Sequence, residues 1–355
     1  MDLSQLDKVP RVMKALMKTQ KGKGYLSLQQ VSVPRIGEND VLIKIFAAGV
    51  CGTDLHIYRD EFPYWPPVIL GHEFSGTIVA VGERVVDWKV GDRVVGEPHT
   101  LACGKCYLCR TGNPQLCSSK RSPGWGIDGA FAEYMRWPET KLLHRVPESL
   151  DMSAAAIVEP LANVITHIAL VNVVTVGDVV VVAGTGPIAI MAAMVAKLSG
   201  ANQVIVFGRN PRKLDVCRTF SAIDGVVNVT EGDPIKVVYD LTHGRGADIF
   251  IEASGSASAL LTGAQVVRKL GTLIGIGLPG NETVEFPYRL LMMKSVKFLF
   301  SLSTKYEAWD RSIRILDKGI IPYEKIITTR LKLDEWETVF ERNSDQNLLK
   351  AIFVM

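Results

Sequence analysis

The chain has 355 residues, of which 47% are hydrophobic and 22% are charged, and its formal net charge is +3. This composition excludes a disordered chain, and so small a net charge, without a dense run of Lys and Arg, argues against nucleic-acid binding. The length exceeds what one hydrophobic core usually supports, so two domains are expected.

The first part of the chain, residues 1–160, favours a β-rich, barrel-like domain. Short apolar segments such as 41–46 and 77–81 have the length of strands and are separated by glycine and proline. The N-terminal residues lack the uninterrupted apolar core of a signal peptide, so we expect a cytoplasmic protein.

A first group of candidate metal ligands lies in this domain. Cys51 is followed by His72 and Glu73, and one thiolate, one imidazole and one carboxylate suit a zinc ion that keeps an open position. Glu159 is a further candidate, because it follows apolar residues and precedes Pro160, an unusual place for an unpaired charge. The group predicts a catalytic zinc site, and the sequence leaves open whether Glu73 or Glu159 is the resting ligand.

A second metal site is predicted by four cysteines in the spacing C-x2-C-x2-C-x7-C, namely Cys103, Cys106, Cys109 and Cys117. Four thiolates leave no open coordination position, so this zinc is expected to be structural. Two disulfides in a secreted loop are the alternative, but a chain with only six cysteines and no signal peptide favours zinc. We therefore expect one catalytic and one structural zinc per chain.

A dinucleotide-binding turn is predicted next, in residues 161–302. An apolar strand at 179–183 leads through the turn residues into a helix that ends near residue 199. The positive end of that helix would face the cofactor phosphates. The uncharged stretch 179–196 resembles a membrane span, but glycine and proline break it, so no membrane segment is expected. The candidate phosphate-binding residues are Gly184, Gly186, Pro187, Ile188 and Ala189.

Alternating apolar segments after this turn predict a doubly wound parallel sheet. Strands are expected at 204–207, 226–229, 247–253, 272–277 and 296–302, with helices from about 212 and at 234–242 and 257–269. The nicotinamide is expected past the strand ends, near Ser254, Gly275 and Gly277.

The C-terminal part, residues 303–355, is expected to return to the first domain. It has a helix-like segment at 333–342 and an apolar end at 349–355. The dinucleotide-binding domain would then be inserted between two parts of the zinc-bearing domain, with the active site in a cleft between the domains.

The phrase Gly71-His72-Glu73-x2-Gly76-x5-Gly82, with Cys51 before it and the four cysteines after it, is similar to the zinc-dependent medium-chain alcohol dehydrogenases. The resemblance covers nearly the whole chain. It implies an α/β protein made of a GroES-like catalytic domain and an inserted Rossmann domain. It also implies a small-molecule substrate and a homo-oligomer, either a tetramer or a dimer.

The branch of the family stays open at this point. The V-E-P-L phrase around Glu159 resembles sorbitol dehydrogenases, whereas C-G-T-D-L-H-I-Y also resembles threonine dehydrogenases. Polyol dehydrogenases of this type share an Arg-Tyr pair where this chain has Ser301 and Leu302. The predicted substrate is therefore a secondary alcohol or polyol, which is oxidised to its ketone.

The same resemblance and the spacing suggest a proton relay. Thr53 lies two residues after Cys51 and is placed to accept the hydroxyl proton, and His56, one helical turn further, could pass it to solvent. Asp54 is expected to orient the imidazole of His72.

Cofactor choice is predicted from the end of the second strand of the sheet. Enzymes that use NAD usually have an acidic residue there, but this chain has Gly208, followed by Arg209 and by Lys213 on the next helix. Two cations without the acid favour NADP(H), with NAD(H) still possible. Exchanging Gly208 for Asp together with Arg209 for Ile is expected to reverse the preference.

Two other classes of protein could contain some of these motifs. A zinc-ribbon module that binds nucleic acid would not need the glycine-rich turn and would have a basic face. A catalytically silent nucleotide-binding relative would lack the ligands of the open zinc site. Both are less consistent with this sequence than an oxidoreductase.

Overall fold

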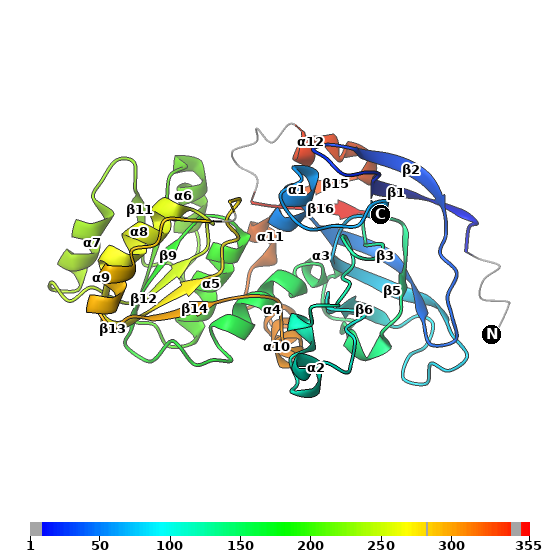
Figure 1. The fold of residues 1–355 in the computed structure, drawn as a ribbon, viewed down its shortest axis with the longest axis horizontal. Coiled ribbons are helices and arrows are strands. Elements are labelled where there is room, and N and C mark those ends of the chain that lie inside the picture. Colours follow the sequence, from blue (N-terminus) through cyan, green and yellow to red (C-terminus); the bar gives the residue numbers. More distant parts are fainter. Residues whose placement is uncertain (1–8, 282, 342–348) are drawn as a thin grey trace. The chain divides into compact units, whose positions relative to one another are not determined.

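The computed structural model describes residues 9–281, 283–341 and 349–355. The chain divides into two compact units, with boundaries after Ala162 and after Leu302. The first unit is rich in strands, and the second is built around one parallel sheet (Figure 1). No helix within the described ranges is both long and apolar enough to span a membrane.

The strand-rich unit contains two sheets. One has three strands in the order β2-β1-β4, and the other has the order β15-β16-β3-β5-β6-β8, with β7 paired to β3. The C-terminal strand β16 lies antiparallel to β3, so the end of the chain is part of this unit. The strands are β1 Val12–Lys18, β2 Leu26–Ser32, β3 Val41–Gly49, β4 Val68–Ile69, β5 Glu73–Val81, β6 Arg93–Gly96, β7 Tyr134–Trp137, β8 Leu143–Arg145, β15 Ile327–Leu331 and β16 Lys350–Val354.

Short helices connect these strands. They are α1 Gly52–Tyr58, α2 Tyr107–Arg110, η2 Pro114–Leu116, η3 Thr140–Leu142, α3 Met152–Ala155, α10 Tyr306–Asp317, α11 Tyr323–Ile326, η4 Leu333–Glu335 and α12 Glu337–Phe340, and α4 Val158–His167 continues into the second unit. The prediction of a single helix at 333–342 is wrong for the described residues, because this segment forms two short helices, η4 and α12. Arg342 lies outside the described residues.

The second unit has the predicted doubly wound sheet. All six strands are parallel, in the order β11-β10-β9-β12-β13-β14. The strands are β9 Val179–Ala183, β10 Gln203–Gly208, β11 Gly225–Asn228, β12 Ala247–Glu252, β13 Val267–Gly275 and β14 Lys297–Phe300. The helices are α5 Pro187–Leu198, α6 Pro211–Arg218, α7 Pro234–Leu241, α8 Ala257–Val266 and α9 Tyr288–Met293.

Most boundaries in this unit lie within two residues of the expectation, and the largest difference is between α8 and β13. The helix predicted to reach residue 269 ends at Val266, and β13 begins at Val267 instead of Thr272. The amine of Lys294 donates to the carbonyls of Ala264, Gln265 and Val267, and so satisfies acceptors at the end of α8. The helix therefore ends where a distant lysine caps it.

Candidate functional site

The four-cysteine lobe is arranged as a tetrahedral metal site would require. The Sγ–Sγ distances are 3.5 Å for Cys106 and Cys109, 3.9 Å for Cys106 and Cys117, and 4.0 Å for Cys103 and Cys109. Zn–S bonds of about 2.3 Å in a tetrahedron give S–S edges of about 3.8 Å. Backbone N–H groups lower the pKa of Cys103 to about 6 and also lower that of Cys117, whereas burial and the neighbouring thiols raise the pKa of Cys109. All six cysteines of the chain are free of disulfides, so the lobe fits zinc.

Three residues of the predicted catalytic zinc site lie together. Ligand atoms of Cys51, His72 and Glu73 are all within 4.8 Å of one another, and the latter two residues are buried. Cys51 is the N-cap residue of α1, and Glu73 is the first residue of β5. A thiolate, an imidazole and a carboxylate form a donor set that zinc accepts while keeping a position open.

Two further acidic residues, Glu159 and Asp54, lie near this cluster. Glu159 is outside the group of atoms within 4.8 Å, but its charge interacts with those of His72 and Glu73. Burial raises the pKa of Glu159 to about 7. Asp54 accepts the N–H of Cys51 at 2.9 Å, and its other oxygen lies 3.6 Å from Nδ1 of His72.

The charge of His72 depends on these neighbours. Burial lowers the pKa of His72, but the negative charges of Asp54 and Cys51 raise it by more, so it lies well above the usual value. Among the described residues, Nδ1 of His72 has no hydrogen-bond partner. Asp54 therefore lies at ion-pair distance from the imidazole rather than at hydrogen-bond distance.

One residue of this site was missed by sequence reasoning. Lys350, at the start of β16, forms a buried ion pair with Glu73 and donates to the carbonyl of Val50 at 2.8 Å. Burial lowers the pKa of Lys350, but the charges of Glu73 and Cys51 raise it by more, so the amine stays charged. A lysine at the head of an apolar C-terminal segment is the only sign of this role in the sequence.

The relay candidates are carried by α1. The hydroxyl of Thr53 lies 3.7 Å from Sγ of Cys51, and His56 lies one turn further along the helix. His56 is partly exposed, and its Nδ1 lies 2.7 Å from a carboxylate oxygen of Glu61. Glu61 is a second neighbour that the sequence did not predict, and it gives the imidazole an acidic partner toward solvent.

The glycine-rich turn has the expected local geometry. Gly184 has a φ of +128°, which L side chains rarely adopt, and Gly186 is the N-cap residue of α5. Pro187 is the first residue of that helix, Ile188 is half-buried, and Ala189 is fully buried against the sheet. The turn thus places backbone N–H groups at the start of a twelve-residue helix, where a pyrophosphate can bind.

A cavity of about 280 Å³ lies beside this turn, at the carboxyl ends of the strands. Gly208 ends β10, and both Arg209 and Lys213 line the cavity with it. No carboxylate stands among the described residues of the lining, which are Ala183, Gly184, Thr185, Phe207, Gly208, Arg209, Asn210, Lys213, Val229, Phe250, Ser254, Ser256, Ser258, Ala259 and Thr262.

The residues expected near the nicotinamide meet around a carboxylate that was not predicted. Glu252, the last residue of β12, accepts the N–H and the hydroxyl of Ser254. Gly275 is paired with Glu252 in the sheet, and the N–H of Gly277 donates to the Glu252 carbonyl at 2.9 Å. Ser254 lines the cavity, whereas Gly275 and Gly277 do not.

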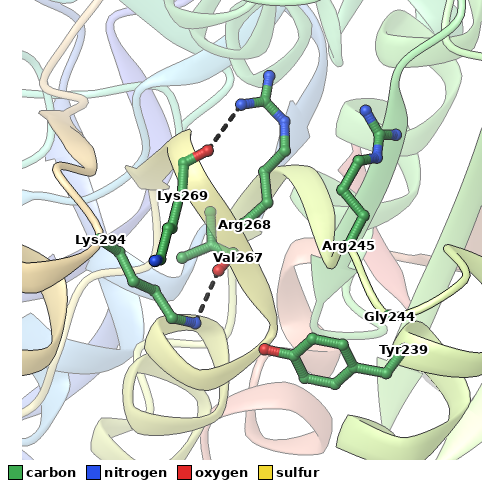
Figure 2. Close-up of a pocket in the computed structure, with 7 residues that line it drawn as sticks. All are labelled: Tyr239, Gly244, Arg245, Val267, Arg268, Lys269 and Lys294. Atoms are coloured by element: carbon green, nitrogen blue, oxygen red, sulfur yellow. Dashed lines mark hydrogen bonds between the residues drawn. The ribbon is translucent and has the colours of Figure 1, made fainter.

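A larger cavity of about 500 Å³ lies at the amino ends of β12 and β13, and Figure 2 shows its lining. Three of its four cationic side chains, those of Arg245, Arg268 and Lys294, are bonded to other parts of the protein. Arg245 and Arg268 both bond to the carboxylate of Asp248, and Lys294 donates to three carbonyls, one of which is that of Val267. Ligands of parallel sheets bind at the carboxyl ends of the strands, so this cavity is not the cofactor site.

Two zinc-type donor sets and a nucleotide-binding parallel sheet define the class as a zinc-dependent oxidoreductase with a nicotinamide cofactor. Residues 37–148 match the model of the alcohol dehydrogenase GroES-like domain, and residues 187–318 match that of zinc-binding dehydrogenases. The chain belongs to the zinc-dependent medium-chain alcohol dehydrogenase family.

Relatives extend over nearly the whole chain. A sorbitol dehydrogenase of Halalkalibacterium halodurans is 35% identical over 96% of this chain and 98% of its own length. An L-threonine 3-dehydrogenase of Bacillus licheniformis is 37% identical over 93% of this chain and 95% of its own length. The structure of a zinc-binding dehydrogenase from Sinorhizobium meliloti 1021 bound to NADP has a TM-score of 0.89 and 30% identity, covering 98% of this chain and all of that one. These relatives confirm the prediction that the chain is a zinc-dependent alcohol or polyol dehydrogenase.

Proposed function

We propose that this enzyme oxidises a secondary alcohol or polyol to its ketone with NADP+ in preference to NAD+. The observation that carries the proposal is the cluster formed by Cys51 at the start of α1 with His72 and Glu73 at the start of β5. NAD+ is the second cofactor in this proposal, since none of the described residues that line the cavity would repel it.

The proposed mechanism assigns separate roles to these residues. Zinc held by the cluster, with Glu159 close by, would supply a Lewis acid that lowers the pKa of the substrate hydroxyl. Thr53 would accept the hydroxyl proton, and His56 would carry it to solvent with Glu61 as its partner. This relay is supported by the 3.7 Å distance from Thr53 to Cys51 and the 2.7 Å distance from His56 to Glu61. Hydride transfer is the chemistry of the nicotinamide.

The preference for NADP+ is supported by the lining of the smaller cavity. Arg209 and Lys213 provide two positive charges beside Gly208, and none of the described residues that line this wall is acidic. A guanidinium can bind a phosphate through two parallel hydrogen bonds. The 2′-phosphate of NADP+ would therefore gain contacts that the hydroxyl of NAD+ does not offer.

A second candidate substrate is a hydroxy amino acid such as L-threonine. It is supported by the 37% identity to a threonine dehydrogenase and by the C-G-T-D-L-H-I-Y segment that includes α1. Both candidates share the zinc ligands and the relay, so the distinction depends on residues that contact the rest of the substrate.

We also propose that the enzyme is a homo-oligomer, either a dimer or a tetramer. Strand β14 ends the six-stranded sheet, and within the described part of the chain it pairs with β13 alone. Phe300 on this strand is 78% exposed, and Leu302 just after it is 64% exposed. An apolar sheet edge of this kind is suited to pairing with a second copy.

The test combines metal content with a substrate panel. Purified enzyme should contain zinc, and alcohols, polyols and L-threonine should be compared by the absorbance of reduced cofactor, with NADP+ and NAD+ in parallel. Turnover of polyols with NADP+ supports the proposal. Turnover of L-threonine alone supports the second candidate, and zinc without turnover of any substrate contradicts both.

A further inference from the structure

The end of β10 has no room for a side chain at Gly208. A Cβ atom built on this glycine would lie 2.4 Å from Cγ2 of Thr185 and 2.8 Å from Cδ2 of Leu214. Carbon atoms in contact are normally about 3.5–4.0 Å apart. The exchange of Gly208 for Asp that the sequence suggested is therefore obstructed by two neighbouring side chains.

The side chain of Thr185 has little room to move away from position 208. It lies between the two glycines of the phosphate-binding turn, after Gly184, whose N–H donates to the Phe207 carbonyl at 2.8 Å. Gly186, on the other side of Thr185, is the N-cap residue of α5. Because the turn is held at both sides and threonine is branched at Cβ, its methyl group has few other positions.

Leu214 is the second side chain that obstructs position 208. It is buried on α6, the helix that begins at Pro211 and bears Lys213. The ends of leucine side chains can shift more readily than a branched residue in a tight turn. Thr185 is therefore the residue that decides whether an acid can stand at position 208.

We propose that Thr185 is a specificity-determining residue for the cofactor. It fills the position from which a carboxylate at the end of β10 would accept hydrogen bonds from the adenosine ribose, and it thereby keeps that wall free of acid. This inference rests on the proposed preference for NADP+, because a wall without acid favours the 2′-phosphate. Cofactor choice is then set by the pair of residues 185 and 208 together.

Matched variants test this coupling. Gly208→Asp alone should lower the melting temperature by several degrees and bind both cofactors poorly. Thr185→Ser removes the methyl group but keeps the hydroxyl, and in combination with Gly208→Asp it should restore the melting temperature. The double variant should also bind NAD+ about tenfold more tightly than Gly208→Asp alone does. Thr185→Val keeps the branched shape and should not rescue Gly208→Asp.

The readouts are the melting temperature and the Kd of each cofactor by titration calorimetry. Rescue by Thr185→Ser and not by Thr185→Val supports the inference. If Gly208→Asp alone is as stable and binds NAD+ as tightly as its combination with Thr185→Ser, the inference is wrong. A wild-type enzyme that binds NAD+ more tightly than NADP+ would refute the proposed preference. The coupling between residues 185 and 208 is measured separately, from melting temperatures without cofactor, and so tests the inference by itself.

Discussion

Lys350 and Glu73 form a buried ion pair between the last strand of the chain and the cluster of zinc-type ligands. Their side chains are 4% and 1% exposed. The pair gives Glu73 a cationic partner inside the unit and holds its side chain next to Cys51 and His72. The C-terminal strand therefore contributes to the site as well as to the sheet.

Removing the amine of Lys350 should destabilise the protein strongly. Lys350→Met leaves the carboxylate of Glu73 buried without its partner, so we expect the free energy of unfolding to fall by about 3–5 kcal/mol. Urea denaturation measures this change. The matched control is Lys14→Met, since Lys14 pairs with Asp334 in an exposed position and should contribute little. Equal small losses in both variants would contradict the expected role of Lys350.

The sequence predicted the elements that depend on neighbouring residues, but not those that depend on contacts between distant parts of the chain. The strand, turn and helix around Gly184 follow from local signals, namely an apolar run, two glycines and a proline at the first helical position. The end of α8 at Val266 could not be predicted in this way, because its cap is supplied by Lys294. The ion pair of Lys350 with Glu73 depends on β16 and β5 both pairing with β3, an arrangement that no local pattern encodes.

The two zinc sites should respond differently to loss of one ligand. Cys51→Ser removes a ligand of the open site and should abolish turnover with little change in melting temperature. Cys106→Ser opens the closed lobe and should lower the melting temperature or the solubility. Metal content per chain, activity and thermal unfolding are to be measured for both. Near-normal turnover of Cys51→Ser with one zinc per chain would show that the two assignments are wrong.

The proton relay predicts graded losses along α1. Thr53→Ala should lower kcat by roughly a hundredfold, the usual effect of a positioned acid or base, whereas Thr53→Ser keeps the hydroxyl and should lose much less. His56→Ala and Glu61→Gln should have smaller effects, because water can reach the partly exposed imidazole. The measurement is kcat as a function of pH. A kcat that is the same in Thr53→Ala and the wild type at every pH excludes the relay.

The exposed edge at β14 predicts the assembly state. Phe300→Lys places a charge on the edge that we propose to pair with a second copy, and it should shift the enzyme toward monomers. Sedimentation velocity at several protein concentrations measures the shift. Val176→Lys is the control, since Val176 is 91% exposed at the start of the second unit, away from β14 in the sheet order. A wild-type enzyme that is monomeric at high concentration contradicts the proposed homo-oligomer.

Cofactor preference should depend on Arg209 more than on its neighbouring cation Arg212. Arg209 lines the cavity beside Gly208, whereas Arg212 is exposed on α6 and is not part of the lining. Arg209→Ile should therefore raise the Kd of NADP+ by about tenfold or more, equivalent to about 1.4 kcal/mol, and leave that of NAD+ nearly unchanged. Arg212→Ile should change neither by a comparable factor. Direct titration of both cofactors into each variant measures these constants. Equal effects of the two substitutions would mean that only the general positive charge matters, and no effect of Arg209→Ile on NADP+ would mean that its guanidinium does not contact the 2′-phosphate.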